Sequence, residues 1–354
     1  MIGFHLTAGR LAAGLCDLAV VCLVVAGVLA LTGGEDEQPP APQPGIGPDA
    51  KRACGYGQNR ISGLKAFERV AGRRFDCALV FTDPPDWAGW ESPYFVDSND
   101  ADINWSGWMS RGRGRRDVII TQGLIPSGLR GTDWLRQGAA GAFDGHARAL
   151  ARRLVKAGMG HAVIRLGHEA NFTRYAWSLP DDEAGQRAWA QTWRREALAM
   201  RSVRGARFRF DLTVNAAVRP IPLDRFWPGD DVVDIVGIDA YDAGIPPGSV
   251  PDRWKRIYER PLGVREVLEF AEAHGKDLSF PEWGVGPADD PELLAGGDDP
   301  AYVEGLAGVV REHRVAYQSY FFNHEWAYQL PRAPRSLEAY RRHFGADGDS
   351  VGDG

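Results

Sequence analysis

The chain has 354 residues, of which 44% are hydrophobic, 25% charged and 10% aromatic, and its formal net charge is −6 at pH 7. This is the composition of an ordinary globular protein, and it excludes a disordered, collagen-like or low-complexity chain. The acidic balance and the lack of a long basic run argue against nucleic acid as a partner, and 4 cysteines are too few for a disulfide scaffold.

The first element is an apolar run over residues 11–32, which only Asp17 interrupts. A run of about 20 apolar residues can cross a bilayer, and the basic Arg10 before it favours an N-terminus inside and the remaining chain outside. A cleaved signal peptide has nearly the same pattern, and Val28-Leu29-Ala30 fits a cleavage site. Residues 1–34 are therefore a signal peptide or a membrane anchor. A buried core helix fits less well, because a polar segment follows at once.

Residues 35–50 are rich in proline and acidic residues and have no apolar periodicity. Such a sequence forms an extended, semi-rigid linker. We therefore expect a globular domain over residues 51–345, followed by a frayed tail over residues 346–354. Within this domain, an exported protein permits a disulfide between Cys54 and Cys77, and two buried free thiols are the alternative.

From residue 52 onward, short β-rich runs alternate with segments whose apolar residues recur at helical spacing. Strand–helix units that alternate in this way over about 300 residues predict a (β/α)8 TIM barrel. An open, doubly wound sheet is the alternative, but no G-x-G-x-x-G follows an early strand. The predicted strands are 53–56, 76–82, 117–122, 161–167, 207–214, 232–240, 277–281 and 316–323, and the helices include 61–72, 142–157, 184–202, 262–274 and 301–314.

Charged residues follow two of these strands. In a TIM barrel, chemistry occurs at the C-terminal ends of the strands. Arg165, His168 and Glu169 end the fourth strand, and Glu282 ends the seventh. Isolated buried charges are costly unless they are paired or used. Since these strands lie across the barrel from each other, the two glutamates would face one another. Glycoside hydrolysis needs such a pair, with one carboxyl protonating the leaving oxygen and the other attacking the sugar carbon or activating water.

Tryptophans gather in the loops that follow the predicted strands. Exposed indoles at an active face are costly apolar surface unless they bind something, and sugar rings present C–H faces that pack well against flat indoles. Simple packing within each loop is the alternative. The predicted glycan-binding residues are Trp87, Trp90, Asn171, Trp177, Trp283 and Trp326.

Four motifs occur in order between residues 53 and 325, and they resemble those of glycoside hydrolase family 26. In this family, strand four carries Arg, two variable residues and then His-Glu, whereas most related barrels place Asn before that Glu. His168 is therefore a discriminating residue. The matching segments are Arg165-Leu166-Gly167-His168-Glu169, Asp234 to Tyr241, Phe280-Pro281-Glu282-Trp283-Gly284, and Leu64 to Arg73.

The resemblance implies a retaining enzyme of clan A, with Glu169 as acid/base and Glu282 as nucleophile. It also implies that Arg165, His168 and Tyr241 hold these two carboxylates in place. Family members are endo-acting. Most cut β-1,4-mannans, and others cut β-1,3-xylan or mixed-linkage β-glucan.

One departure concerns the substrate. In mannanases, a bulky residue, Asn and Gly usually follow the acid/base. This chain keeps Asn171 but has Phe172 in place of the Gly.

We expect a monomeric endo-β-glycanase of the β-mannan type, secreted or anchored outside the plasma membrane through the N-terminal segment. A hydrolase of the host's own exopolysaccharide or wall glycan, and a non-hydrolytic glycan-binding barrel, are the alternatives. No H-E-x-x-H or Cys-rich spacing occurs, so we expect no metal and no other cofactor.

Overall fold

The computed structural model describes residues 53–111, 116–216, 218–289, 293–322 and 329–345. The predicted anchor or signal segment, the linker, the tail and Trp326 lie outside these described residues. The chain divides into two units, Met1–Gly45 and Ile46–Gly354, and the described residues all lie in the second. Within the described part, no helix has the length and apolar character needed to cross a membrane.

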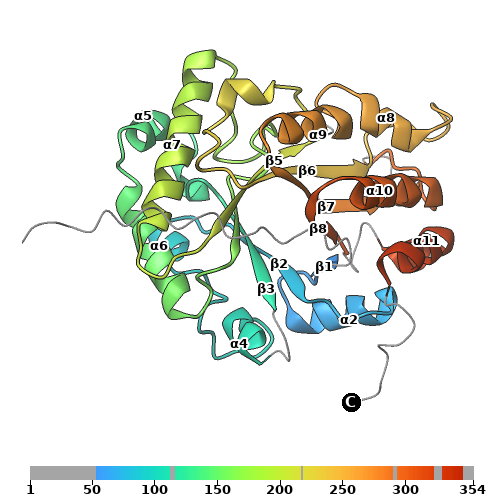
Figure 1. Cartoon of the computed structure of the whole chain (residues 1–354), viewed down its shortest axis with the longest axis horizontal. Coiled ribbons are helices and arrows are strands. Elements are labelled where there is room, and N and C mark those ends of the chain that lie inside the picture. The colour runs from blue at the N-terminus through green and yellow to red at the C-terminus, as the bar shows by residue number, and fades with distance from the viewer. Residues whose placement is uncertain (1–52, 112–115, 217, 290–292, 323–328, 346–354) are drawn as a thin grey trace, which may run out of the picture. The chain divides into compact units, whose positions relative to one another are not determined.

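The strands form a closed parallel barrel, and each pairs with the next in chain order until β8 pairs with β1. Figure 1 shows the helices arranged around the strands. The predicted (β/α)8 barrel is therefore confirmed. The strands are β1 (Ala53–Tyr56), β2 (Cys77–Thr82), β3 (Asp117–Gln122), β4 (Val163–Leu166), β5 (Arg209–Asn215), β6 (Ile235–Asp242), β7 (Asp277–Val285) and β8 (Val315–Tyr320).

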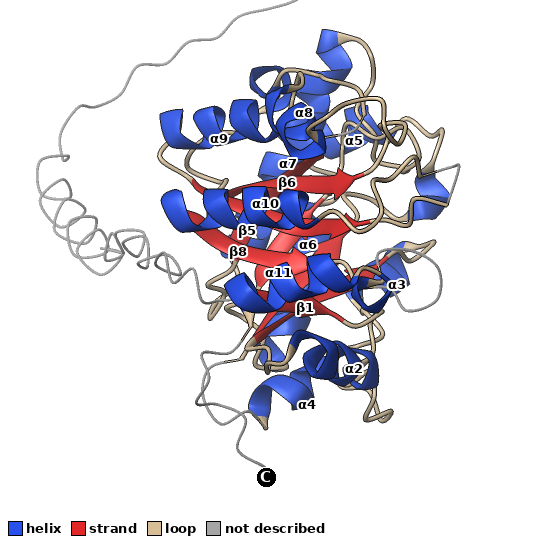
Figure 2. Cartoon of the chain, turned by 90° about the vertical axis from the view of Figure 1, so that its right-hand side faces the viewer, coloured by secondary structure: helices blue, strands red, loops and turns tan. Residues whose placement is uncertain are grey.

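The helices lie outside the sheet, as Figure 2 shows for α8 to α11. They are amphipathic: α2 buries Ile61, Leu64, Phe67 and Ala71, which recur every three or four residues along one face. The helices are α2 (Ile61–Ala71), α3 (Trp87–Glu91), α4 (Trp105–Ser110), α5 (Trp134–Ala139), α6 (Asp144–Lys156), α7 (Glu183–Arg201), α8 (Arg253–Glu259), α9 (Val264–Ala273), α10 (Pro300–Glu312) and α11 (Pro334–Phe344). Short 3₁₀ turns are η1 (Ser127–Leu129), η2 (Leu223–Phe226) and η3 (Leu330–Arg332).

The barrel interior changes from apolar to polar along the strands. Near their N-terminal ends, a cluster that includes Leu79, Ile119 and Val163 is buried. Further along, the buried side chains are polar or charged, among them Arg165 and Asp239. Apolar side chains therefore fill the barrel at the N-terminal ends of the strands. The polar groups lie at the C-terminal ends, where TIM-barrel enzymes have their active sites.

Cys54 and Cys77 are direct neighbours in the register of β1 and β2, with their Cα atoms 4.6 Å apart. Their sulfurs form a disulfide in the structure. The bond links the first two strands at the N-terminal end of the barrel, and it fits an oxidising compartment.

Strand β7 is longer than the sequence predicts, because it continues past Pro281 to Val285. Proline cannot donate a ladder hydrogen bond, so a strand is expected to end there. The structure accommodates Pro281 where the register of β7 shifts against β8 between Phe280 and Trp283. Such irregularities are common beside active sites, and this one places Glu282 inside the strand instead of after it.

A buried carboxyl on α7 generates a stability prediction. Glu196 is 1% exposed, and neither of its carboxyl oxygens has a hydrogen-bond partner among the described residues. Burial, and secondarily the charge of Asp144, raises the pKa of Glu196 well above 4.5. In the unfolded chain this carboxyl ionises near pH 4.5, whereas in the folded chain it stays protonated to higher pH. The free energy of unfolding therefore falls as the pH rises above about 4.5.

We therefore expect Glu196→Gln to raise the free energy of unfolding relative to the parent protein, and by more at pH 8 than at pH 5. The difference between the two pH values should exceed about 1 kcal/mol. Urea denaturation of both proteins at each pH measures it. Glu183→Gln, at an exposed position of the same helix, is the control. An equal effect at both pH values would contradict the prediction.

Candidate active site

The segment that follows β4 has a tightly fixed backbone. Gly167 and Glu169 both adopt positive φ values, 60° and 47°, and such a value is unusual for a glutamate. A Cβ at position 167 would lie 3.1 Å from both Leu124 and Trp189, so this glycine also permits close packing. This turn places Glu169 at the C-terminal end of the barrel strands.

Indole N–H groups hold the same segment from outside. Trp193 donates to the carbonyl of Leu166 at 2.9 Å, and Trp177 donates to the carbonyl of His168 at 2.9 Å. Trp189 in turn donates to the carbonyl of Trp177 at 2.7 Å. These bonds satisfy backbone groups that no strand partner reaches, and they fix the chain on both sides of Gly167.

Glu169 is 4% exposed, and its hydrogen-bond partners among the described residues are neutral. The side-chain amide of Asn215 donates to its Oε1, and the hydroxyl of Tyr175 lies 3.0 Å from its Oε2. Burial, followed by the negative charge of Glu282, raises the pKa of Glu169. The site therefore favours the protonated acid at position 169.

Glu282 is 7% exposed and has different partners. The guanidinium of Arg165 donates to its Oε1 at 2.5 Å, and the hydroxyl of Tyr241 donates to its Oε2 at 2.7 Å. Charge-assisted hydrogen bonds of this kind stabilise a carboxylate. The contacts expected of Arg165 and Tyr241 are thus present at this glutamate.

Arg165 is completely buried and joins several strands. Besides Glu282, it donates to Asp239 of β6 and to Thr213 of β5, the latter at 3.0 Å. Burial alone would lower its pKa, but the charges of Asp239 and Glu282 outweigh that effect and raise it. The guanidinium therefore remains charged beneath the two glutamates.

A second buried carboxyl lies deeper in the barrel. Asp211 accepts hydrogen bonds from Ser279 at 2.7 Å, Tyr317 at 2.6 Å and Thr213 at 2.8 Å. Burial raises its pKa, although these three donors oppose the shift. Thr213 joins Asp211 to Arg165, so the two groups belong to one connected hydrogen-bond network.

The resemblance implied that His168 helps to hold the two carboxylates. In the structure, His168 makes no hydrogen bond to either glutamate. Its ring packs edge-on against Phe81 and Tyr175, with centroids 5.8 and 4.7 Å apart. Its Nδ1 has no hydrogen-bond partner among the described residues. Burial, and then the charge of Arg165, lowers its pKa, so the ring is neutral and acts as a packing surface.

Most of the tryptophans predicted to bind sugar lie in the core instead. Trp90 and Trp283 are 0% exposed and Trp177 is 1% exposed, so these indoles offer no face to a ligand. Trp90 donates to Gly123 and Trp283 to Gln318, each by its ring N–H. Trp87 is only partly buried, and it stacks on His146 at 4.0 Å. The sequence showed that these residues follow strands but not which way their side chains point.

Asn171 is also fully buried, and it contacts the backbone of a neighbouring strand instead of the solvent. Its side chain accepts from the N–H of Asn215 and donates to the carbonyl of Asn215, both at 2.9 Å. The predicted sugar contact is therefore replaced by a structural one. Asn171 aligns Asn215 with Glu169.

Among the described residues, several tyrosines and phenylalanines at the C-terminal end of the barrel remain partly exposed. Tyr56 stacks on Phe321 at 4.3 Å, and Phe81 packs edge-on against both, at 5.3 and 6.0 Å. Tyr94, whose hydroxyl reaches the carbonyl of Phe81 at 3.3 Å, is 45% exposed. The sequence did not predict these residues, because the sequence alone does not distinguish an exposed Tyr or Phe near a strand end from one that packs in the core. Asn215 ends β5, and its side-chain amide donates to Glu169.

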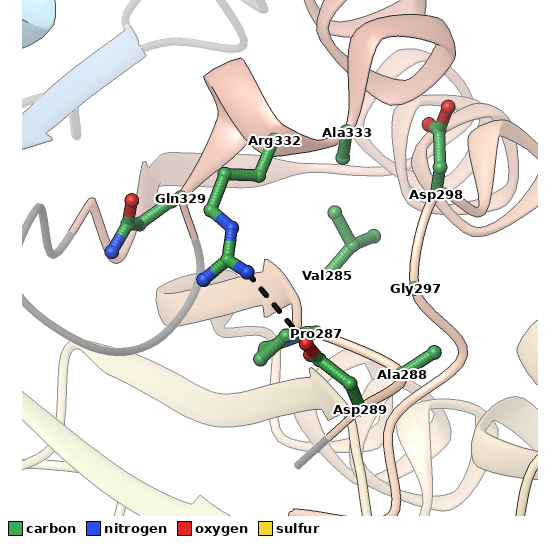
Figure 3. Close-up of a pocket in the computed structure, with 10 residues that line it drawn as sticks. Val285, Pro287, Ala288, Asp289, Gly297, Asp298, Gln329, Arg332 and Ala333 are labelled. Atoms are coloured by element: carbon green, nitrogen blue, oxygen red, sulfur yellow. Dashed lines mark ion pairs between the residues drawn. The ribbon is translucent and has the colours of Figure 1, made fainter.

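Two further features stand apart from the glutamates. Within the described residues, no group of three or more His, Cys, Asp or Glu side chains could hold a metal ion. A hollow of about 250 Å³ lies beyond the end of β7, and Arg332 and Asp289 form an ion pair of 3.7 Å in its lining. Figure 3 shows this pair and the other lining residues. Neither Glu169 nor Glu282 lines this hollow, and we assign no role to it.

The electrostatic link between the glutamates is testable. Glu282→Gln removes the negative charge that helps to raise the pKa of Glu169. We expect the pKa of Glu169 to fall in this variant, as measured by ¹³C NMR titration of labelled glutamate carboxyls. Asp252→Asn, a helix cap on the surface, is the control. An unchanged pKa would show that burial alone sets the protonation of Glu169.

Comparisons with known proteins agree with the barrel fold. Residues 147–277 match the family model of glycosyl hydrolase family 26, and nothing among the curated proteins matches the chain.

Similar solved structures include a modular endo-β-1,4-mannanase from Cellulomonas fimi (16% identity, TM-score 0.58, covering 86% of this chain and 72% of that chain). A Bacillus subtilis mannanase is 18% identical with a TM-score of 0.55, covering 85% and 89%. A family 26 β-mannanase from Bacteroides ovatus is 14% identical with a TM-score of 0.54, covering 85% and 90%. At these identities the structures support the fold. With the family match, they confirm the resemblance to glycosyl hydrolase family 26 and support a glycoside hydrolase.

Proposed function

We propose that the protein is a retaining endo-β-glycanase of the β-mannan type, with Glu169 as acid/base and Glu282 as nucleophile. The observation that carries the proposal is the contrast between the two buried glutamates. Glu282 contacts a cation and a hydroxyl, whereas Glu169 receives two neutral groups and has a raised pKa. Glycoside hydrolysis uses two carboxyls in different surroundings, one that gives a proton and one that attacks the sugar carbon.

In the first step, a carboxylate oxygen of Glu282 bonds to the anomeric carbon while the bond to the leaving oxygen breaks. Glu169 gives its proton to that oxygen, so the sugar chain beyond it leaves as an alcohol. In the second step, Glu169 takes a proton from water, whose oxygen bonds to the anomeric carbon and releases Glu282. Tyr241 and Arg165 keep Glu282 oriented throughout.

The choice of a β-mannan substrate rests on what the similar structures are called, since those from Cellulomonas fimi, Bacillus subtilis and Bacteroides ovatus are described as mannanases. We further propose a monomer that acts on polysaccharide outside the plasma membrane and needs no nucleic acid partner. The apolar run at residues 11–32 and the Cys54–Cys77 disulfide support the location.

The first test is release of reducing ends from β-mannan, galactomannan, β-1,3-xylan and mixed-linkage glucan. We expect release from mannan, and a fall of about 10³-fold or more in Glu169→Ala and in Glu282→Ala. Glu183→Gln is the surface control. Release that survives either active-site substitution would contradict the assigned roles, and binding without release would favour the non-hydrolytic alternative.

A second test concerns the partly exposed aromatic residues. Tyr94 is exposed beside Phe81, in the loop that leaves the active-face end of β2, so we expect it to support a sugar ring of the polymer. Tyr94→Ala should raise KM for polymeric substrate about 5-fold, with kcat nearly unchanged. Leu198→Ala removes the other large exposed apolar side chain of the described residues, on the outer helix α7, and serves as control. A fall in kcat with unchanged KM would contradict this role.

A further inference from the structure

The carboxyl of Glu169 is held at both oxygens by groups of different chemistry. Asn215 donates an amide N–H to Oε1, and the Tyr175 hydroxyl lies 3.0 Å from Oε2. An amide N–H can only donate, so it prefers an oxygen without a proton. A hydroxyl can donate or accept, so it tolerates either state of the oxygen that it faces.

The orientation of Asn215 is itself fixed by Asn171. The Asn171 amide accepts from the N–H of Asn215 and donates to its carbonyl, and it donates also to the carbonyl of Arg219 at 3.1 Å. With an N–H on one side and carbonyls on the other, the Asn171 amide has one orientation that satisfies all partners. It contacts only backbone atoms of Asn215, so the side chain of Asn215 stays directed at Glu169.

Arg219 also links the segment after β5 to the segment after β4. The Arg219 guanidinium donates to the carbonyl of Asn171 at 3.2 Å and to the carbonyl of Leu179 at 2.6 Å. The loop after β5 is thereby joined to the loop after β4. The end of β5 that carries Asn215 and the loop that carries Glu169 cannot shift independently without breaking these bonds.

We propose that Asn215 is a positioning residue that keeps the Glu169 proton on Oε2, beside Tyr175, and away from Oε1. The proposal rests on the role of Glu169 as acid/base in the proposed function. In the first step, the Oε2–H bond breaks and the proton bonds to the leaving oxygen, which takes the electron pair of the broken C–O bond. Oε1 remains bonded to Asn215, and in the second step Oε2 receives the proton from water.

The test compares leaving groups, because a good leaving group departs without a proton. In Asn215→Ala, kcat/KM should fall about 10-fold or more for oligosaccharides, whose leaving group is an alkoxide. For dinitrophenyl glycosides it should change by less than about twofold, since dinitrophenolate needs no acid. Asn104→Ala, which removes an asparagine that caps α4, is the control and should affect both substrates equally. Equal losses on both substrates in Asn215→Ala would overturn the proposal.

A second readout does not require turnover. Without the amide donor, the charged form of Glu169 loses a hydrogen bond, so the pKa of Glu169 should rise in Asn215→Ala and the basic limb of the pH profile should move up. The ¹³C titration of Glu169 measures this shift even if no polymer is cleaved, which separates this inference from the proposed function. An unchanged pKa would overturn it. If Asn215→Ala does not fold, Asn215→Ser, which keeps the backbone bonds to Asn171, provides the same comparisons.

Discussion

The active-face end of the barrel depends on one buried guanidinium. Arg165 has no exposure to solvent, yet it lies among the carboxyls of Glu282, Asp239 and, more distantly, Asp211. Burying a charged pair costs as much desolvation energy as it returns in attraction, so such a pair is weak evidence for stability. The reason to keep Arg165 is its geometry, since its hydrogen bond fixes the position of the Glu282 carboxyl.

The same cation explains why two similar residues can have different roles. Glu169 and Glu282 are both glutamates at the mouth of one barrel, and both are nearly buried. Arg165 donates directly to Glu282 and not to Glu169, whose partners are neutral. A carboxyl that is buried without a direct cation tends to hold its proton, whereas one bonded to a cation tends to lose it. In the mechanism that we propose, this asymmetry of partners, and not any difference between the side chains, distinguishes the acid/base from the nucleophile.

The fold could be predicted because its signal is repeated. Each strand–helix unit carries its own periodicity, so an error of a few residues at one boundary leaves the barrel unchanged. The exception was β7, where Pro281 suggested an end and a shift of register allowed the strand to continue. Glu169 and Glu282 were also predictable, because a charge at the end of a buried strand conflicts with packing unless it is used.

The surroundings of the glutamates could not be predicted in the same way. Whether a tryptophan faces a ligand or the core depends on side-chain direction and on what packs against it, and neither is written in the local sequence. Asn171 was expected to meet sugar and instead pairs with the backbone of Asn215. His168 was expected to hold a carboxylate and instead packs between rings. These are long-range contacts between loops, which only the folded chain brings together.

The indole N–H bonds to the segment around Gly167 have a consequence for how such an enzyme can change. Trp177 and Trp193 hold this segment from the side of the helices, through the carbonyls of His168 and Leu166. Tyr56 ends β1 and Phe321 follows β8, and neither ring takes part in these bonds. In the function that we propose, the residues that contact the sugar and those that position the acid/base are therefore separate sets. A lineage can alter the first by point substitution while the second is inherited intact.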